Sequence, residues 1–167
     1  MSSFPNEPTG HVRTTPEGRQ LVIERTFRAP IGDVWASLTE SDRFARWYGT
    51  LEGEAGPGKT ITVAMTAEEE VVETPVRILE CDPPNGFKVD LGDEGEPWHI
   101  DVRLTEADGT TTLVFVQTLT DAIDVTDIGP GWEFYADRLT AALTDVEMPD
   151  WEADAYLDAL APHYREQ

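Results

Sequence analysis

Residues 21–49 read LVIERTFRAPIGDVWASLTESDRFARWYG, and this stretch decides the fold. Apolar and polar residues alternate over positions 21–28, which predicts a strand. Pro30 follows, at a place where the first turn of a helix tolerates proline. The next apolar residues have the spacing of one helical face: Ile31, Val34, Trp35 and Leu38. A second short helix is predicted from Ser41 to about Gly49. A strand therefore leads into two small helices.

Further strands follow without helices between them. Alternating or β-branched runs separated by turn residues predict them at 50–55, 59–66, 71–80, 87–91, 98–105 and 111–119. The tripeptide Ala107-Asp108-Gly109 between the last two is a hairpin signal. Six or seven strands in series predict an antiparallel meander, and with the helices an α+β fold.

A long helix is predicted from about 130 to 146, with Pro130 placed to start it and Pro149 to end it. Its apolar face comprises Trp132, Tyr135, Ala136, Leu139, Ala142, Leu143 and Val146. Asp150 can cap a last short helix that carries Trp151, Ala155 and Leu160 and ends at Pro162. Residues 1–18 are rich in Pro, Ser, Thr and Gly, which favours a tail.

The Ala29-Pro30 entry to the helices, the Arg46-Trp47 pair and the segment GWEFYADRL at 131–139 resemble the SRPBCC (START-like, Bet v 1-like) superfamily. Within it, the sequence is most similar to the homologues of a heat-shock-chaperone ATPase activator. The resemblance implies a helix-grip fold, in which a curved antiparallel sheet wraps around the long C-terminal helix and leaves a cavity. We therefore expect a flexible tail at 1–18, the SRPBCC domain at 19–147 and a C-terminal extension with a short helix at 148–167.

The chain is strongly acidic, with 33 acidic and 12 basic residues and a net charge of −21. Such a charge repels phosphate backbones and anionic lipid, so we expect neither nucleic acid nor membrane as partner. No apolar run approaches the ~20 residues of a membrane span. The first residues lack the basic and apolar regions of a signal peptide, and Cys81 is the sole cysteine. These features predict a cytoplasmic protein without internal disulfides.

Residues 53–60, GEAGPGKT, match the phosphate-loop pattern. A phosphate loop leads into a helix N-terminus, whereas Thr60 opens the alternating, β-branched run ITVAMT. The segment is therefore predicted to be a turn between two strands, and Lys59 is not expected to bind nucleotide. The resemblance implies a glycine-rich loop beside the cavity at this place.

The sequence predicts no catalytic residue, metal ion or cofactor. The histidines His11, His99 and His163 are scattered, and the acidic turn at 92–96 lacks the ligand ladder of a calcium loop. Asp82 raises the pKa expected for Cys81 and so makes it a poor nucleophile.

Two polar residues, Arg25 and Gln117, share the inward parity of apolar neighbours on their strands. Each either makes a structural pairing or orients the polar group of a ligand. Six apolar and aromatic residues are further candidates for the cavity wall: Trp47, Trp98, Phe115, Trp132, Tyr135 and Leu139. Core packing is the alternative for these residues.

The resemblance implies three functions. The first is a module that binds an apolar or amphipathic small molecule inside the cavity. The second is a protein-interaction module that modulates a chaperone ATPase, with a chaperone or another protein as its partner. The third is an enzyme of the cyclase or isomerase type acting inside the cavity, for which the sequence offers no evident acid–base pair.

Overall fold

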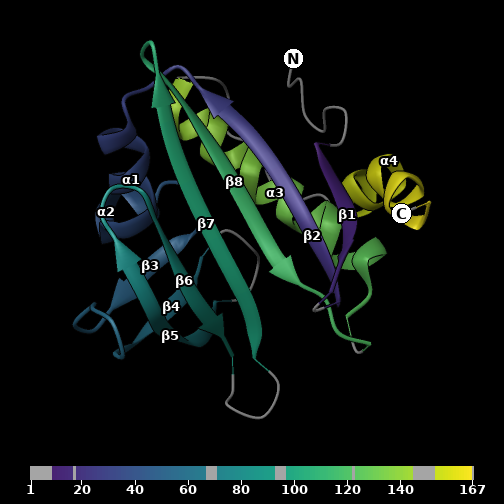
Figure 1. The fold of residues 1–167 in the computed structure, drawn as a ribbon, viewed down its shortest axis with the longest axis horizontal. Coiled ribbons are helices and arrows are strands. Elements are labelled where there is room, and N and C mark those ends of the chain that lie inside the picture. The colour runs from purple at the N-terminus through teal and green to yellow at the C-terminus, as the bar shows by residue number, and fades with distance from the viewer. Residues whose placement is uncertain are drawn as a thin grey trace.

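The computed structural model describes residues 9–16, 18–66, 71–92, 97–121, 123–144 and 153–166. The helices and strands occur in the order β1 (Gly10–Thr15), β2 (Gly18–Phe27), α1 (Ile31–Thr39), α2 (Ser41–Phe44), β3 (Gly49–Glu52), β4 (Thr60–Met65), β5 (Val72–Asp82), β6 (Gly86–Leu91), β7 (Trp98–Ala107), β8 (Thr110–Thr118), α3 (Val125–Thr144) and α4 (Ala153–Arg165) (Figure 1).

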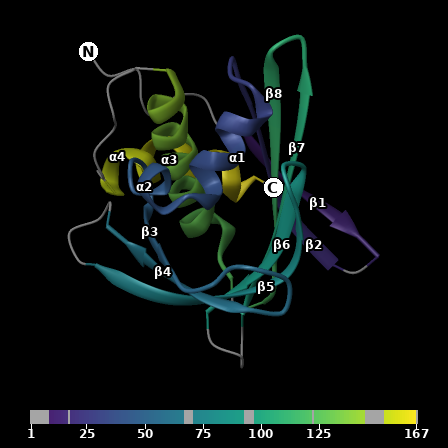
Figure 2. The same ribbon diagram turned by 90° about the vertical axis from the view of Figure 1, so that its left-hand side faces the viewer.

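The strands form one antiparallel sheet with the order β1-β2-β8-β7-β6-β5-β4-β3. Figure 2 shows that this sheet bends sharply and that the helices lie inside the bend. The predicted α+β, helix-grip fold is therefore confirmed. The described part of the chain contains eight strands, one more than the upper end of the predicted range.

The additional strand is β1, which lies in the stretch predicted to be a tail. It pairs along its whole length with β2, from Gly10 opposite Ile23 to Thr15 opposite Gly18. Oγ1 of Thr15 donates a hydrogen bond to the carbonyl oxygen of Gly18 at 2.9 Å, which closes the connection between the two strands. The prediction of a tail is thus wrong for residues 10–15.

The two short helices follow β2 as predicted. Pro30 stands just before α1, in extended conformation, and its carbonyl oxygen accepts hydrogen bonds from the backbone of Asp33 and Val34. Beyond α2, the indole Nε1 of Trp47 donates to the carbonyl oxygen of Ser37 at 2.8 Å. This bond ties the end of the second helix to α1.

The boundaries of the two later helices differ from the prediction. Helix α3 begins at Val125, and Pro130 lies inside it rather than at its start. Helix α4 continues past Pro162, the residue predicted to end it. Proline lacks the backbone N–H but is compatible with helical φ, and so marks a helix boundary only approximately. Val146, Pro149, Asp150 and Trp151, and the side chain of Ala155, lie outside the described residues.

The phosphate-loop-like segment is a turn between β3 and β4, as predicted. Thr60 opens a strand rather than a helix, so no helix N-terminus is available there for a phosphate. Nζ of Lys59 lies 2.6 Å from a carboxylate oxygen of Glu54 within the same turn. Among the helices of the described ranges, none is long and apolar enough to cross a membrane.

Candidate ligand cavity

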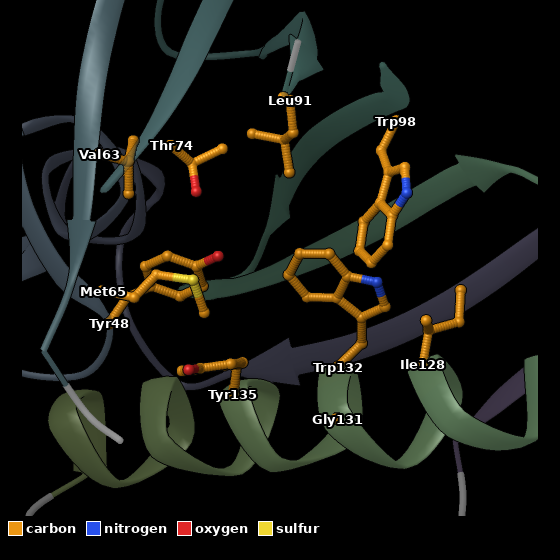
Figure 3. Close-up of a pocket in the computed structure, with 11 residues that line it drawn as sticks. Tyr48, Val63, Met65, Thr74, Leu91, Trp98, Ile128, Gly131, Trp132 and Tyr135 are labelled. Atoms are coloured by element: carbon orange, nitrogen blue, oxygen red, sulfur yellow. The ribbon is translucent and has the colours of Figure 1, made fainter. Parts of the chain in front are cut away.

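A cavity of about 390 Å³ lies between α3 and the strands β4 to β7. The described residues that line it are Tyr48, Val63, Met65, Thr74, Leu91, Gly92, Trp98, Ile128, Gly131, Trp132 and Tyr135. Figure 3 shows α3 on one side of the space and the strand residues on the other. Its volume falls within the range of small-molecule pockets, roughly 300–1,000 Å³.

The local sequence explains why these side chains meet. Val63 and Met65 are two positions apart on β4 and so share one face of the sheet. Thr74 lies across from Val63 on β5 and presents its side chain to the same face. On α3, the lining residues 128, 131, 132 and 135 have the spacing of one helical face. Alternation and helical periodicity thus place both walls.

The wall contains a continuous series of aromatic rings. The ring centroids of Trp98 and Trp132 are 6.3 Å apart, and those of Trp132 and Tyr135 are 6.4 Å apart. Tyr135 in turn lies 4.5 Å from Tyr48. Phe115 packs against Trp132 at 4.8 Å from outside the described lining. The cavity is therefore bounded mainly by π surfaces and aliphatic groups.

Gln117 holds the central ring of this wall from behind. Its Oε1 accepts a hydrogen bond from the indole Nε1 of Trp132 at 2.6 Å. Gln117 is fully buried, and its Nε2 has no hydrogen-bond partner among the described residues. Because the indole N–H only donates, the amide must turn its oxygen toward Trp132. The two N–H groups of the amide therefore point away from Trp132.

Arg25 belongs to a different cluster, away from the residues that line the cavity. Its guanidinium lies 3.0 Å from Oε1 of Glu133 and 2.8 Å from Oδ1 of Asp137, two carboxylates of α3. The side chains of Glu133 and Asp137 are 1% and 2% exposed. These contacts favour the structural pairing among the two interpretations of Arg25.

The same carboxylates anchor α4 and the segment that enters β1. The hydroxyl groups of Tyr164 and Tyr156 donate to Glu133 and Asp137 at 2.7 and 2.9 Å. The backbone N–H of Thr9 donates to Glu133 at 2.8 Å. We call Arg25, Glu133, Asp137, Tyr156 and Tyr164 the buried ionic cluster. It joins β2, α3 and α4.

Burial dominates the electrostatics of this cluster. Burial raises the pKa of Asp137, although Arg25 opposes the shift. Burial also raises the pKa of both tyrosines, and the neighbouring carboxylate adds to it: Asp137 for Tyr156 and Glu133 for Tyr164. Both phenols therefore stay protonated and remain donors over the whole neutral range.

The structure brings together some of the eight predicted cavity residues and separates others. Trp98, Trp132 and Tyr135 line the cavity, while Phe115 and Gln117 contact Trp132. Two others pack elsewhere: Trp47 lies in a buried cluster with Phe44 and Tyr48, and Leu139 is a core residue outside the described lining. A role in ligand binding stays a prediction for all of these residues.

Sequence reasoning missed the other eight residues of the described lining: Tyr48, Val63, Met65, Thr74, Leu91, Gly92, Ile128 and Gly131. Thr74 shares the face of the buried Val76 and Ile78, so its inward direction was readable from the alternation of β5. Periodicity does not tell, however, whether an inward residue meets another side chain or an open space. No local signal distinguishes the two.

The described residues hold no group of three or more His, Cys, Asp or Glu side chains arranged to bind a metal ion. Cys81 is partly buried, and burial followed by the charge of Asp82 raises the pKa of its thiol. This direction agrees with the expectation that Cys81 is a poor nucleophile.

Comparison with known proteins places the fold in a family. Residues 28–144, from the end of β2 to the end of α3, match the family model described as activator of Hsp90 ATPase homolog 1-like protein. No curated protein sequence matches the chain.

Several solved structures are similar to the whole chain. The crystal structure of CalU16 from Micromonospora echinospora is 23% identical, covers 96% of each chain and has a TM-score of 0.73. The protein encoded by gene BPP1335 from Bordetella parapertussis is 24% identical, with 100% of this chain and 95% of that chain covered and a TM-score of 0.74. DynU16, a protein in the dynemicin biosynthetic locus, is 19% identical over 80% of this chain and 51% of its own, with a TM-score of 0.68.

At these identities the structural neighbours show the fold alone, whereas the family model covers well over half of the sequence. The curved sheet, the helix held within it and the match over residues 28–144 agree. The chain therefore belongs to the family of activator of Hsp90 ATPase homolog 1-like proteins, within the SRPBCC superfamily.

Proposed function

We propose that this protein binds an apolar or amphipathic small molecule in the cavity between α3 and the strands β4 to β7. The observation that carries the proposal is the cavity itself, which has about 390 Å³ of space behind an aromatic and aliphatic wall. Ligand pockets combine such a wall with a few polar groups that fix orientation. The polar side-chain groups of the described lining are the hydroxyls of Tyr48, Thr74 and Tyr135 and the indole N–H of Trp98, since the indole N–H of Trp132 donates to Gln117.

The structural neighbours support a small molecule as the ligand class. DynU16 shares the fold, and its description places it in the dynemicin biosynthetic locus. Because a protein of this fold occurs in a locus for the biosynthesis of a small organic compound, such a compound is the ligand class that we propose here. We propose the cytoplasm as the compartment, because the single cysteine, Cys81, is a free thiol and suits a reducing environment.

Filling the cavity tests the proposal. Leu91 lines the cavity from β6, and Leu91→Trp would occupy the space at a cost of about 1–3 kcal/mol from overpacking. Leu79→Trp is the matched control, because Leu79 is 42% exposed on β5 and does not belong to the described lining. The probe is the neutral dye N-phenyl-1-naphthylamine, whose fluorescence rises in apolar surroundings.

The natural chain and Leu79→Trp should bind the dye alike, and Leu91→Trp should bind it at least about tenfold more weakly, a loss of about 1.4 kcal/mol. Circular dichroism and urea denaturation establish that each variant is folded. Equal binding by the natural chain and the folded Leu91→Trp variant would overturn the proposal, as would no binding by any of the three.

A protein-interaction module that modulates a chaperone ATPase is the second candidate. The family description names such an activity, and three apolar side chains are exposed at β5: Val71, Val72 and Leu79. Replacing all three by serine should abolish any stimulation of a purified chaperone ATPase while leaving dye binding intact. No stimulation by the natural chain would remove this candidate.

A cyclase or isomerase acting in the cavity is not favoured by the described lining. Among its side chains, only hydroxyl and indole groups can exchange a proton, and none of them has a pKa near neutrality in its ordinary state. General acid–base catalysis works best with groups that titrate near the working pH.

A further inference from the structure

Aromatic rings contribute to the cavity wall from two sides, and Trp98 and Trp132 meet edge to face. Figure 3 shows Trp132 and Tyr135 rising from α3 and Trp98 entering from the strand side. The planes of Trp98 and Trp132 are inclined by 65°, and those of Trp132 and Tyr135 by 56°. The face of an aromatic ring carries partial negative charge, and tryptophan attracts a cation most strongly.

The described lining contains no basic side chain that could pair with an anion. Two arginines near α3 in the described part of the chain are engaged with other groups. Arg25 pairs with Glu133 and Asp137 in the buried ionic cluster. Nε of Arg138 donates to the carbonyl oxygen of Trp47 at 2.7 Å, and its guanidinium lies over the ring of Phe134. An acid group on a ligand would therefore find no counter-charge among the described lining residues.

The charge of the whole chain acts in the same direction. A net charge of −21 gives the protein a negative potential, which lowers the local concentration of anions and raises that of cations. Moving a carboxylate from water against an apolar wall without a partner is unfavourable, because the charge loses its hydration. A cation loses water as well, but the ring faces replace part of that hydration.

We propose that the ligand of this cavity is an aromatic or apolar molecule that carries a positively charged amine or quaternary ammonium group. This inference rests on the proposed function, because it specifies the chemistry of the ligand that the cavity holds. The cationic group lies against Trp98 and Trp132, and the apolar body fills the space toward Val63, Met65 and Leu91.

Three probes with the same naphthalene body and different charge test the proposal. They are (2-naphthylmethyl)trimethylammonium, 2-naphthalenemethanol and 2-naphthoate, each titrated into the full chain by calorimetry. The cation should bind roughly 2- to 30-fold more tightly than the neutral alcohol, the range expected for a cation–π contact. The carboxylate should bind more weakly than the alcohol.

Trp98→Leu identifies the contact responsible. This variant keeps an apolar wall but removes an aromatic ring, so the ratio of the cation's affinity to the alcohol's affinity should fall several-fold, whatever loss of binding the two probes share. Trp35→Leu is the matched control, because Trp35 packs against Phe87 outside the described lining. This control should retain the preference of the natural chain. A preference that persists unchanged in Trp98→Leu would contradict the assignment.

Attraction of the cation to the acidic surface must be separated from binding in the cavity. Raising the salt from about 0.1 M to about 1 M shortens the screening length from about 10 Å to about 3 Å, which suppresses surface attraction more than a buried contact. Cation binding that disappears at high salt, or that survives in Leu91→Trp, would overturn the proposal.

The outcomes for the two proposals differ. Binding of the alcohol with equal or weaker binding of the cation would refute the charge preference and leave the proposed function standing. Failure of all three probes and of the neutral dye would refute the proposed function and the charge preference with it.

Discussion

The indole Nε1 of Trp132 donates a hydrogen bond to Oε1 of Gln117 at 2.6 Å, across the space between α3 and β8. Trp132 lines the cavity, while Gln117 is fully buried behind it. The bond fixes the rotation of the indole ring and therefore the shape of the wall. Gln117, which does not line the cavity, can therefore affect binding of the proposed ligand through Trp132.

Gln117→Met tests this connection. The side chains are similar in size, so the lost hydrogen bond is the main change, and removal of the unpaired Nε2 offsets part of its cost. The free energy of unfolding in urea should change by less than about 1.5 kcal/mol. Affinity for the neutral dye should fall roughly three- to tenfold, because the Trp132 ring is no longer held. Affinity equal to that of the natural chain would show that Gln117 does not position the ring.

Arg25→Met should be strongly destabilising. It leaves Glu133 and Asp137 buried without their counter-charge, which typically costs about 3–5 kcal/mol. Arg103→Met is the control, since Arg103 makes ion pairs with Asp101 and Glu80 on an exposed surface, where such pairs contribute about 0–1 kcal/mol. Urea denaturation of both variants measures the difference. Equal losses would mean that the cluster does not stabilise the fold as the geometry indicates.

Alkaline pH should weaken the fold through Tyr164. Burial and then Glu133 raise the pKa of Tyr164 above its ordinary value of 10.0. Above pH 10 the unfolded chain releases this proton while the folded protein keeps it, so stability is lost as the pH rises. Tyr164→Phe removes this ionisable hydroxyl. The variant's unfolding free energy should therefore fall less steeply above pH 10, by up to about 1.4 kcal/mol per pH unit.

The alkaline experiment contains its own control. Tyr164→Phe also removes the hydrogen bond to Glu133, so the variant should be less stable at neutral pH. Only the slope of the unfolding free energy against pH reports the ionisation of the Tyr164 phenol. The other members of the cluster, Arg25, Glu133, Asp137 and Tyr156, are present in both proteins, so their effects remain in both slopes. Identical slopes for the natural chain and the variant would show that the phenol ionises as readily in the folded state as in the unfolded one.

Lys59→Ala should leave the protein nearly unchanged. Lys59 pairs with Glu54 in an exposed turn that leads into a strand, so its loss should alter stability by no more than about 0.5 kcal/mol. Neither the natural chain nor the variant should bind ATP at micromolar concentration in calorimetry. Tight ATP binding that depends on Lys59 would refute the assignment of residues 53–60 as a turn without nucleotide function.

Local patterns in the sequence predicted the main elements because these follow from periodicity. The alternation of β2 and the helical spacing in α1 place their apolar faces without reference to the rest of the chain. Strand β1 was missed because GHVRTT has a single large apolar residue, Val12. Its pairing with β2, rather than its own pattern, makes it a strand.

The buried ionic cluster could not be predicted for a similar reason. Glu133 and Asp137 are four residues apart on α3, a spacing that is typical of a solvated helical face. Their burial depends on the tyrosines of α4, which lie on another helix, and on Arg25, which is more than a hundred residues away in sequence. Inward parity correctly marked Arg25 as unusual. It could not name the partners, because a pairing over more than a hundred residues leaves no local signal.

The contact between β1 and α4 has a consequence for how the nascent chain folds. Nε2 of His163 donates to the carbonyl oxygen of Gly10 at 2.7 Å, across 153 residues of sequence. During synthesis α3 leaves the ribosome before α4. The hydrogen bonds from Tyr164 to Glu133 and from Tyr156 to Asp137 therefore form only after α4 has been made. The contact between Gly10 and His163 is expected to form slowly, because the chain must first close a loop of 153 residues. Helix α4, which is synthesised after α3, thus completes the hydrogen bonds of the buried carboxylates.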